Sequence, residues 1–315
     1  MKKTNFFLIL FIALLCIGNI NAQNKSISIW TPTSTTQFAG KTLLNNGSYP
    51  EHSEFYELNI NQLKDALQDA PLREVANGVS NTIVDFPVGN GQLISFKIME
   101  TPTMHPDLAA RYPSIKSYVG YGVSTADVIR FSLSNQKGLS SMLIPGNKKP
   151  VFLESYTSDL TTYTVYARMN ETRENTFNCL TDDVPYDLKK NISSSSTQKD
   201  ANDQTLRKFR LAMSATGEFT AWHGGTKADA LAAINTTMTR VNGVYETDFA
   251  ITMELIANTD DVIYTDAGTD PYGSRLNGEL QATLTSVITE AAYDIGHLVH
   301  QESNSNGNAG CIGCV

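Results

Sequence analysis

Segments with the spacing of strands and of helices alternate through the last third of the chain. Residues 209–215 and 249–257 have the pattern of strands, and a long segment with helical spacing begins at Thr226. A second helical segment starts near Asn277 and leads into a strand over residues 294–300. This alternation is typical of a sheet covered by helices, so we expect an α/β unit here.

The apolar residues of the two helical segments predict which faces are buried. Thr226 and Asp229 nearly match a capping box, with Asp in place of Glu or Gln, and they predict the start of the first helix. Side chains that recur every three or four residues predict a stripe facing the core. In the first helix the stripe consists of Leu231, Ile234, Met238, Val241 and Tyr245, and in the second of Leu280, Leu284, Ile288 and Ala291.

The preceding half of the chain has the pattern of a β-rich unit. Short alternating or β-branched segments are separated by Gly, Pro and Asn, which is typical of antiparallel strands joined by turns. One helix is expected near its start, capped by Asn61, with Leu63, Ala66, Leu67 and Ala70 on one face. The predicted strands cover residues 82–86, 92–98, 128–133, 150–154 and 161–167.

A polar, Ser-rich segment over residues 191–203 separates the two units. It contains almost no apolar side chains, so it cannot bury enough surface to offset the entropy of ordering. We therefore predict a linker, and linkers between folded units are preferred sites of proteolysis.

The N-terminus has the pattern of a secretory signal peptide. Met1-Lys2-Lys3 is basic, residues 6–17 are apolar, and Ala22 is a plausible cleavage point. The apolar run is shorter than the roughly 20 residues of a membrane-spanning helix. A lipid anchor at Cys16 is the weaker alternative, because bulky Leu14 and Leu15 precede it. We expect an exported chain, secreted or at the cell surface, without a membrane span once the signal is removed.

Composition excludes some partners. The formal net charge of −8 argues against nucleic acid or an anionic membrane as the main partner. With 41% hydrophobic and 18% charged residues, the chain can form packed cores. No phosphate-binding glycine loop and no G-x-S-x-G motif is present, so no motif in the sequence supports a nucleotide-binding or serine hydrolase function.

Three cysteines remain after removal of the signal peptide: Cys179, Cys311 and Cys314. An odd number in an exported protein implies a free thiol, an intermolecular bond or a partner beyond this chain. Cys311 and Cys314 have C-x-x-C spacing, which also occurs in redox motifs and zinc knuckles. Ordinary structural disulfides are the preferred interpretation, because no second ligand pair or redox context accompanies them.

The order of elements after residue 208 resembles the first half of the catalytic domain of reprolysin-like (adamalysin-like) metzincins. Asp294 and Leu298 match the D-x-x-x-L pattern of a strand in that family, and residues 309–315 stand where its Cys-bearing edge strand begins. The resemblance implies a zinc-dependent endopeptidase acting on proteins or peptides. It also implies that substrates lie along an edge strand comprising Ala309, Gly310, Cys311 and Ile312.

The zinc motif of that family is missing from these 315 residues. None of His52, His105, His223, His297 and His300 belongs to an H-E-x-x-H, or to the longer H-E-x-x-H-x-x-G-x-x-H. The sequence therefore contains neither catalytic residues nor zinc ligands that we can name. We expect zinc in the complete protein, with ligands outside this chain, and we expect this chain to be an incomplete and inactive fragment.

These observations together predict an α+β chain with two domains. We expect a signal peptide over residues 1–22, a β-rich propeptide-like domain over 23–175, a linker over 176–205 and the N-terminal part of a metzincin-like α/β domain over 206–315. The competing interpretation is a non-catalytic secreted or cell-surface binding or adhesion protein.

Cys179 precedes the linker, where a propeptide thiolate can hold a metallopeptidase latent by occupying the open zinc position. The surrounding sequence lacks the family's usual propeptide cysteine motif. A disulfide to a later cysteine, Cys311 or Cys314 among them, and a buried inert thiol remain open alternatives.

Two other sets of residues invite a metal interpretation. His297 and His300 are three positions apart on a predicted strand, so their side chains point to opposite faces, and packing or surface roles are preferred. His223 is expected in a turn beside Gly224. The carboxylates between Asp260 and Asp270 could bind calcium, but they match no EF-hand spacing, and Asp is common in turns.

Overall fold

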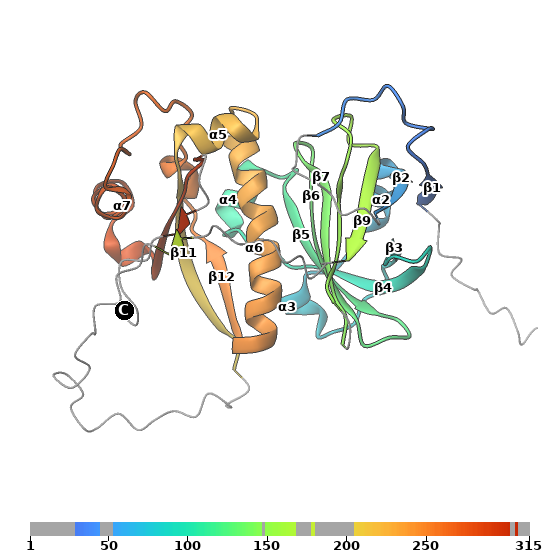
Figure 1. Ribbon diagram of the computed structural model, residues 1–315. Coiled ribbons are helices and arrows are strands. Elements are labelled where there is room, and N and C mark those ends of the chain that lie inside the picture. The colour runs from blue at the N-terminus through green and yellow to red at the C-terminus, as the bar shows by residue number, and fades with distance from the viewer. Residues whose placement is uncertain are drawn as a thin grey trace, which may run out of the picture.

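In the computed structural model of the protein, two units pack side by side (Figure 1). The first is β-rich, and the second is a smaller α/β unit, as the sequence predicted for the fold class. The residues that the structure describes are 29–44, 53–146, 149–167, 178–179, 205–302 and 306–307. The predicted signal peptide, most of the linker and the predicted edge strand lie outside them.

The β-rich unit consists of one antiparallel sheet of nine strands in the order β1-β2-β9-β8-β7-β6-β5-β4-β3. Consecutive strands from β3 to β9 are neighbours, which is the connectivity of a meander. The strands are β1 (Trp30–Thr33), β2 (Glu54–Leu58), β3 (Ile83–Pro87), β4 (Leu93–Glu100), β5 (Lys116–Gly122), β6 (Val128–Ser134), β7 (Gly138–Ile144), β8 (Val151–Ser155) and β9 (Thr162–Ala167).

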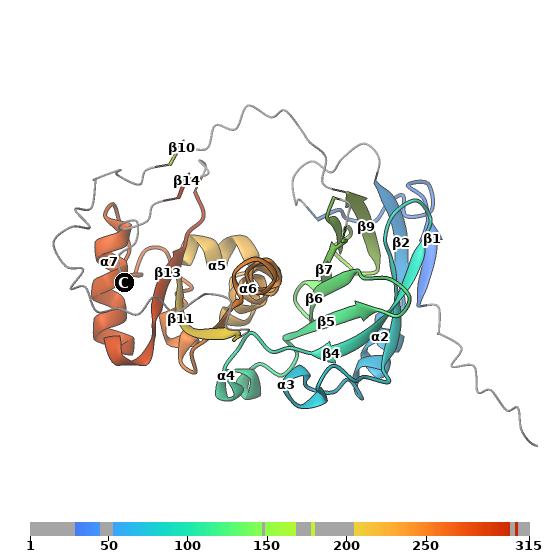
Figure 2. The same cartoon turned by 90° about the horizontal axis from the view of Figure 1, so that it is seen from below.

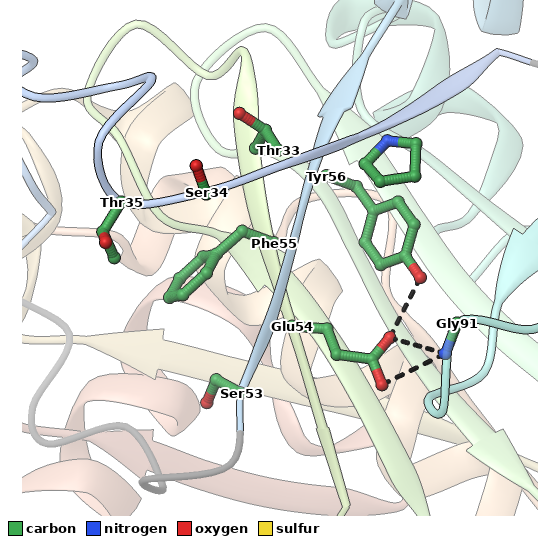
Figure 3. Close-up of a pocket in the computed structure, with 9 residues that line it drawn as sticks. Thr33, Ser34, Thr35, Ser53, Glu54, Phe55, Tyr56 and Gly91 are labelled. Carbon is green, nitrogen blue, oxygen red and sulfur yellow. Dashed lines mark hydrogen bonds between the residues drawn. The ribbon is translucent and has the colours of Figure 1, made fainter.

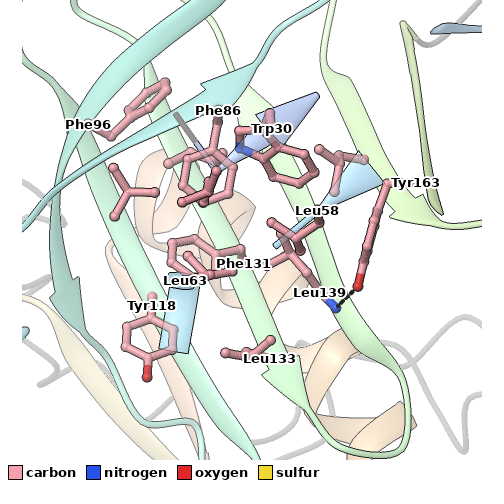
Figure 4. Packing of buried hydrophobic residues seen from close by; sticks show 14 of the residues in the cluster. Trp30, Leu58, Leu63, Phe86, Phe96, Tyr118, Phe131, Leu133, Leu139 and Tyr163 are labelled. Carbon is pink, nitrogen blue, oxygen red and sulfur yellow. Dashed lines mark hydrogen bonds between the residues drawn. The ribbon is translucent and has the colours of Figure 1, made fainter. Parts of the chain in front are cut away.

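The sheet curls until its first and last strands lie close together. The indole Nε1 of Trp30 in β1 donates to the carbonyl oxygen of Asp85 in β3 at 2.7 Å. The ring centroid of Trp30 also lies 6.2 Å from that of Phe86 (Figure 4). A single apolar core therefore fills the concave side, and Phe86, Phe96 and Phe131 are fully buried in it.

Helix α2 (Ile60–Leu67) packs against this core. Leu63 and Leu67 are buried, and Ala66 and Ala70 are partly buried against the same cluster, as the sequence predicted. The predicted cap was wrong: the side chain of Asn59 accepts the bond from the amide of Gln62. An N-cap residue lies just before the first helical residue, and here the helix already begins at Ile60, so Asn61 is inside it.

The second unit is built on a parallel sheet of three strands in the order β12-β11-β13. Its strands are β11 (Arg207–Ala215), β12 (Ile251–Leu255) and β13 (Ile295–Val299). The side chains of β11 alternate between two layers. Leu211 and Met213 face the layer with helix α6 (Lys227–Phe249), whereas Ala212 faces a layer with α7 (Leu276–Thr283) and the π-helical turn η2 (Leu284–Ile288). Helices therefore cover both faces of the sheet.

Most of the predicted elements in this unit are present. Thr226 and Asp229 form the capping box of α6, and Leu231, Ile234 and Met238 are buried along its predicted stripe. Tyr245, at the end of that stripe, is exposed. Ala291 is exposed as well, because the helical stretch ends at Ile288 and Ala291 lies in the short 3-10 turn η3 (Glu290–Ala292).

Helix α6 is buried on two sides, because it lies between the two sheets (Figures 1 and 2). One side packs on the three-stranded sheet through its apolar stripe. The opposite side packs on β5, β6 and β7 of the nine-stranded sheet. A Cβ at Gly243 would lie 2.9 Å from Cγ of Arg130, so glycine allows the close approach of α6 to β6.

The β-rich unit also contributes to the core of the second unit. The connection between β4 and β5 contains helix α4 (Pro106–Arg111). Its neighbours Met104 and Ile115, together with Leu108, are buried in the same apolar cluster as Leu211 and Leu255. The cores of the two units are therefore not independent.

Among the described residues, no helix has both the length and the apolar character needed to cross a membrane.

Shortening Leu63 to Ala should destabilise the β-rich unit. The side chain is fully buried in the curled sheet, so its removal leaves a cavity and should lower the free energy of unfolding by about 2–5 kcal/mol. Denaturant unfolding measures the change. Leu93→Ala, on an exposed side chain, is the matched control and should stay within about 0.5 kcal/mol of the wild type. Equal losses for the two variants would contradict this packing.

Candidate functional site

Strand β13 forms one edge of the three-stranded sheet, and no other described strand pairs with its outer side. Its start is fixed by Asp294, one of the two residues of the D-x-x-x-L pattern. The amide of Asp294 donates to the carbonyl oxygen of Arg210 at 2.9 Å, and the Arg210 amide donates back to Asp294 Oδ2 at 2.7 Å. The side-chain and backbone hydrogen bonds from Arg210 hold the pKa of Asp294 below its usual value.

The far end of β13 is fixed by helix α5 (Gly217–His223), which the sequence did not predict. The amide of Thr216 donates to the carbonyl oxygen of Val299 at 3.2 Å. The Thr216 hydroxyl lies 3.0 Å from Nδ1 of His300, and a carboxylate oxygen of Glu218 lies 3.8 Å from the same nitrogen. His300 therefore interacts with the N-terminal end of α5.

The described residues do not fit a zinc ion. No group of three or more His, Cys, Asp or Glu side chains in the described part of the chain is arranged to hold a metal. His297 lies on β13, and His300 is engaged with α5. His105 is the cap of α4, where its Nδ1 accepts from the amide of Asp107 at 3.2 Å. His52 lies outside the described residues.

His223 is the last residue of α5, and not part of a turn as predicted. Its ring packs edge-on against Phe219 at a centroid distance of 4.4 Å. Its carbonyl oxygen accepts from Nζ of Lys137 at 2.9 Å. Burial, and then the nearby positive charge of Lys137, lower the pKa of the His223 imidazole to about 4, although Asp229 opposes them.

The carboxylates of Asp260, Asp266 and Asp270 form hydrogen bonds within the protein. Both oxygens of Asp260 accept from Arg111, at 2.6 and 3.1 Å. Asp266 accepts from the amide of Gly268, and Asp270 accepts from the amides of Gly217 and Tyr272. The turn interpretation accounts for the bonds of Asp266 to Gly268 and of Asp270 to Tyr272, whereas Asp260 binds Arg111 of α4; among the residues that the structure describes, none of these carboxylates belongs to a group arranged to hold a metal.

Two segments that are distant in the sequence form a short parallel pair. Strand β10 (Asn178–Cys179) pairs in parallel with β14 (Asn306–Gly307), and Cys179 lies opposite Gly307 in the register (Figure 2). Cys311, Cys314 and the predicted edge strand from Ala309 to Ile312 lie outside the described residues, so their roles stay predictions.

A surface hollow of about 410 Å³ lies over β2, bounded by Thr33, Phe55 and Gly91 among others (Figure 3). Its charged residue, Glu54, accepts from the Tyr56 hydroxyl at 2.9 Å and from the amide of Gly91 at 3.1 Å. Burial, and then Glu54, raise the pKa of Tyr56 to about 12, so its hydroxyl stays protonated. The carboxylate of Glu54 is therefore held by hydrogen bonds within the protein.

The charged cluster that the sequence did not reveal lies between the two units. Glu246 of α6 is bonded to Arg130 of β6, and its Oε2 accepts from NH1 of Arg73 at 2.5 Å. The side chains of Arg130 and Glu246 are 5% and 7% exposed. Burial opposes ionisation of Glu246, but Arg130 and Arg73 outweigh it and lower the pKa of the carboxyl.

Further polar contacts continue along the same side of α6. The hydroxyl of Ser132 lies 2.9 Å from that of Thr236, and NH2 of Arg240 donates to Glu154 and Ser140 at 2.7 Å. The side of α6 toward the β-rich unit is therefore polar and hydrogen-bonded, whereas the side toward its own sheet is mainly apolar, with Asn242 bonded to the backbone of Met253.

Comparison with known proteins gives one result for the second unit. Residues 205–315 match the family model described as metallo-peptidase family M12B, reprolysin-like. No curated protein matches the chain.

Substituting Glu246 with Gln should destabilise the chain. It leaves the buried guanidinium of Arg130 without its carboxylate, and breaking a buried pair in this way costs about 3–5 kcal/mol. Glu74→Gln is the matched control, because Glu74 pairs with Lys208 on the surface and should contribute at most about 1 kcal/mol. Denaturant unfolding measures the loss of unfolding free energy in each variant, and equal losses would contradict a role for the buried pair.

His223 should contribute to acid sensitivity. Its folded pKa is about 4, below its ordinary value of 6.5, so the neutral ring stabilises the fold above pH 6.5. That contribution is lost as the pH falls from 6.5 through 4. In His223→Gln, the free energy of unfolding should fall less over this window than in the wild type. Denaturant titrations at several pH values measure both slopes, and identical slopes would exclude His223 as a contributor.

Proposed function

We propose that this chain is part of the precursor of a secreted zinc-dependent metalloendopeptidase, because residues 205–315 match the reprolysin-like model of metallopeptidase family M12B. The match to this family is the observation that carries the proposal, and the order β11-α6-β12-α7-β13 lies within the matched residues. The proposed reaction is hydrolysis of peptide bonds in proteins or peptides. The substrate class follows from the family and not from a pocket in this chain.

Zinc is the metal proposed for the complete protein. In such enzymes the ion activates a water molecule for attack on the peptide carbonyl. The described residues do not fit the ion, and the sequence contains no H-E-x-x-H. We therefore propose that the ligands and the general base lie outside these 315 residues.

The β-rich unit is proposed to be the propeptide of this precursor, and the polar segment 191–203 its activation linker. The signal-like N-terminus supports export, and the scarcity of apolar residues in the linker supports access by a processing protease. The packing of α6 against β6 supports a propeptide that covers part of the second unit. Removal of the β-rich unit would expose that side of α6.

Cys179 is the proposed inhibitory thiol, with a disulfide and an inert thiol as alternatives. The backbone pairing of β10 with β14 supports a location of Cys179 beside the residues that precede the proposed substrate strand in the sequence. Titration of free thiols in the native chain separates a disulfide from the other two states.

The second candidate function is a non-catalytic secreted or cell-surface binding protein. The absence of H-E-x-x-H from the sequence favours it. The reading frame after Val315 separates the two functions. An H-E-x-x-H shortly downstream, and cleavage of casein by the full gene product that a chelator abolishes, would support the peptidase. A stop codon directly after Val315 would support the binding protein.

The 315-residue chain by itself should neither hold zinc stoichiometrically nor cleave protein. Three His ligands and a Glu base are needed for the proposed chemistry, and the sequence does not contain them in the required motif. Metal analysis after dialysis, together with casein digestion, tests this expectation. Zinc near one per chain, with activity that a chelator abolishes, would show that a site in these residues has been missed.

A further inference from the structure

The connection between β4 and β5 belongs to the β-rich unit in the sequence but extends the sheet of the second unit. The amide of Leu255 in β12 donates to the carbonyl oxygen of Thr103 at 2.8 Å, and the amide of His105 donates to the carbonyl oxygen of Leu255 at 2.8 Å. Met104 and Leu255 form a parallel bridge. The edge of β12 that does not pair with β11 is thus covered by a short added strand segment. Adding a strand to the edge of a sheet is a common mode of peptide recognition.

The same segment also covers apolar side chains of the second unit beside that edge. After Thr103, the chain turns into α4, whose Leu108 is fully buried. Leu108, Met104 and Ile115 belong to one cluster with Leu211 of β11, Leu231 of α6 and Leu255 of β12. Removing this segment would expose the apolar side chains of three elements of the second unit.

Polar contacts fix both ends of the segment. At its start, the hydroxyl of Thr103 donates to Oδ1 of Asn235 at 2.5 Å. At its end, NH2 of Arg111 donates to Asp260 Oδ1 at 2.6 Å and to the carbonyl oxygen of Ala257 at 2.5 Å. The Tyr112 hydroxyl donates to the same carboxylate. Asp260 keeps a lowered pKa, because the bonds and charge of Arg111 outweigh the opposing effect of its burial.

We infer that the edge of β12, the adjoining side of α6 and Asp260 form a peptide-binding groove, and that its occupant is the chain's own segment from Thr103 to Ile115. The groove takes an extended stretch followed by one short helix. Such a ligand carries two apolar anchors four residues apart, here Met104 and Leu108, and an arginine that reaches Asp260. Through this groove the two units stay bound to each other after the linker is cut.

The contacts of this segment determine when the β-rich unit can separate from the second unit. Cleavage within 191–203 breaks the chain but none of the contacts of Thr103–Ile115, and the polar contacts of Glu246 and Arg240 also remain. The β-rich unit therefore leaves only when the segment leaves the groove and the polar contacts of Glu246 and Arg240 break as well. The inference takes from the proposed function only that the linker is where cleavage occurs.

The test uses the full chain with the recognition sequence of a site-specific protease inserted between residues 191 and 203. After complete cleavage, gel filtration and mass spectrometry should find the two fragments together at a ratio of one to one. Leu108→Asp places a charge in the groove and should raise the dissociation constant of the cleaved pair at least about tenfold. Leu93→Asp, at an exposed position of β4, is the control and should behave as the wild type.

Arg111→Ala is a second variant, which tests the inference even if Leu108→Asp does not fold. The Arg111 side chain is 46% exposed, so its loss leaves the core intact while removing the bonds to Asp260 and Ala257. The fragments of this variant should separate severalfold faster than those of the control. Separation of the wild-type fragments at neutral pH and moderate salt would overturn the inference, as would equal dissociation of Arg111→Ala and the control. None of these results depends on peptidase activity, so failure here is distinct from failure of the proposed function.

Discussion

The burial of helix α6 on two opposite sides is the constraint on which the arrangement of the protein depends. On one side, Leu231, Ile234 and Met238 form the core of the three-stranded sheet. On the other side, Asn235 and Glu246 are satisfied by groups of the β-rich unit, and a buried polar group without such partners would be costly. Both sheets bury this helix and share its apolar and polar contacts, so we infer that the two units form one cooperative structure.

The sequence allowed prediction of elements whose signals are local. The capping box of α6 and the strand of β11 lie within short windows, so they could be recognised directly. Four strands of the large sheet, β1, β2, β5 and β7, were missed, and at β5 and β7 helix α6 covers the outer face of the sheet. Both strands are buried on both faces, which removes the alternation of polar and apolar residues. Helix α5 has seven residues, which is too short for a clear helical period.

Among the candidate sites too, features defined by contiguous residues could be predicted and those formed by distant residues could not. The absence of the zinc motif could be seen in the sequence, because that motif is contiguous. The pair of Arg130 and Glu246 joins residues 116 positions apart, and neither has a local signal that marks it. The groove filled by Leu108 could not be predicted either, since an amphipathic turn between two strands does not show which unit it packs against. Such long-range pairings require the structure.

Hydrogen exchange of the full chain tests the cooperative structure most directly. Leu63→Ala weakens the apolar core of the β-rich unit, and no residue of α6 or β11 belongs to that cluster. If the two units unfold together, the slowest-exchanging amides of β11 and β12 should lose protection by the same factor as those of β6. Loss of protection confined to the nine-stranded sheet, with β11 and β12 unchanged, would contradict the account.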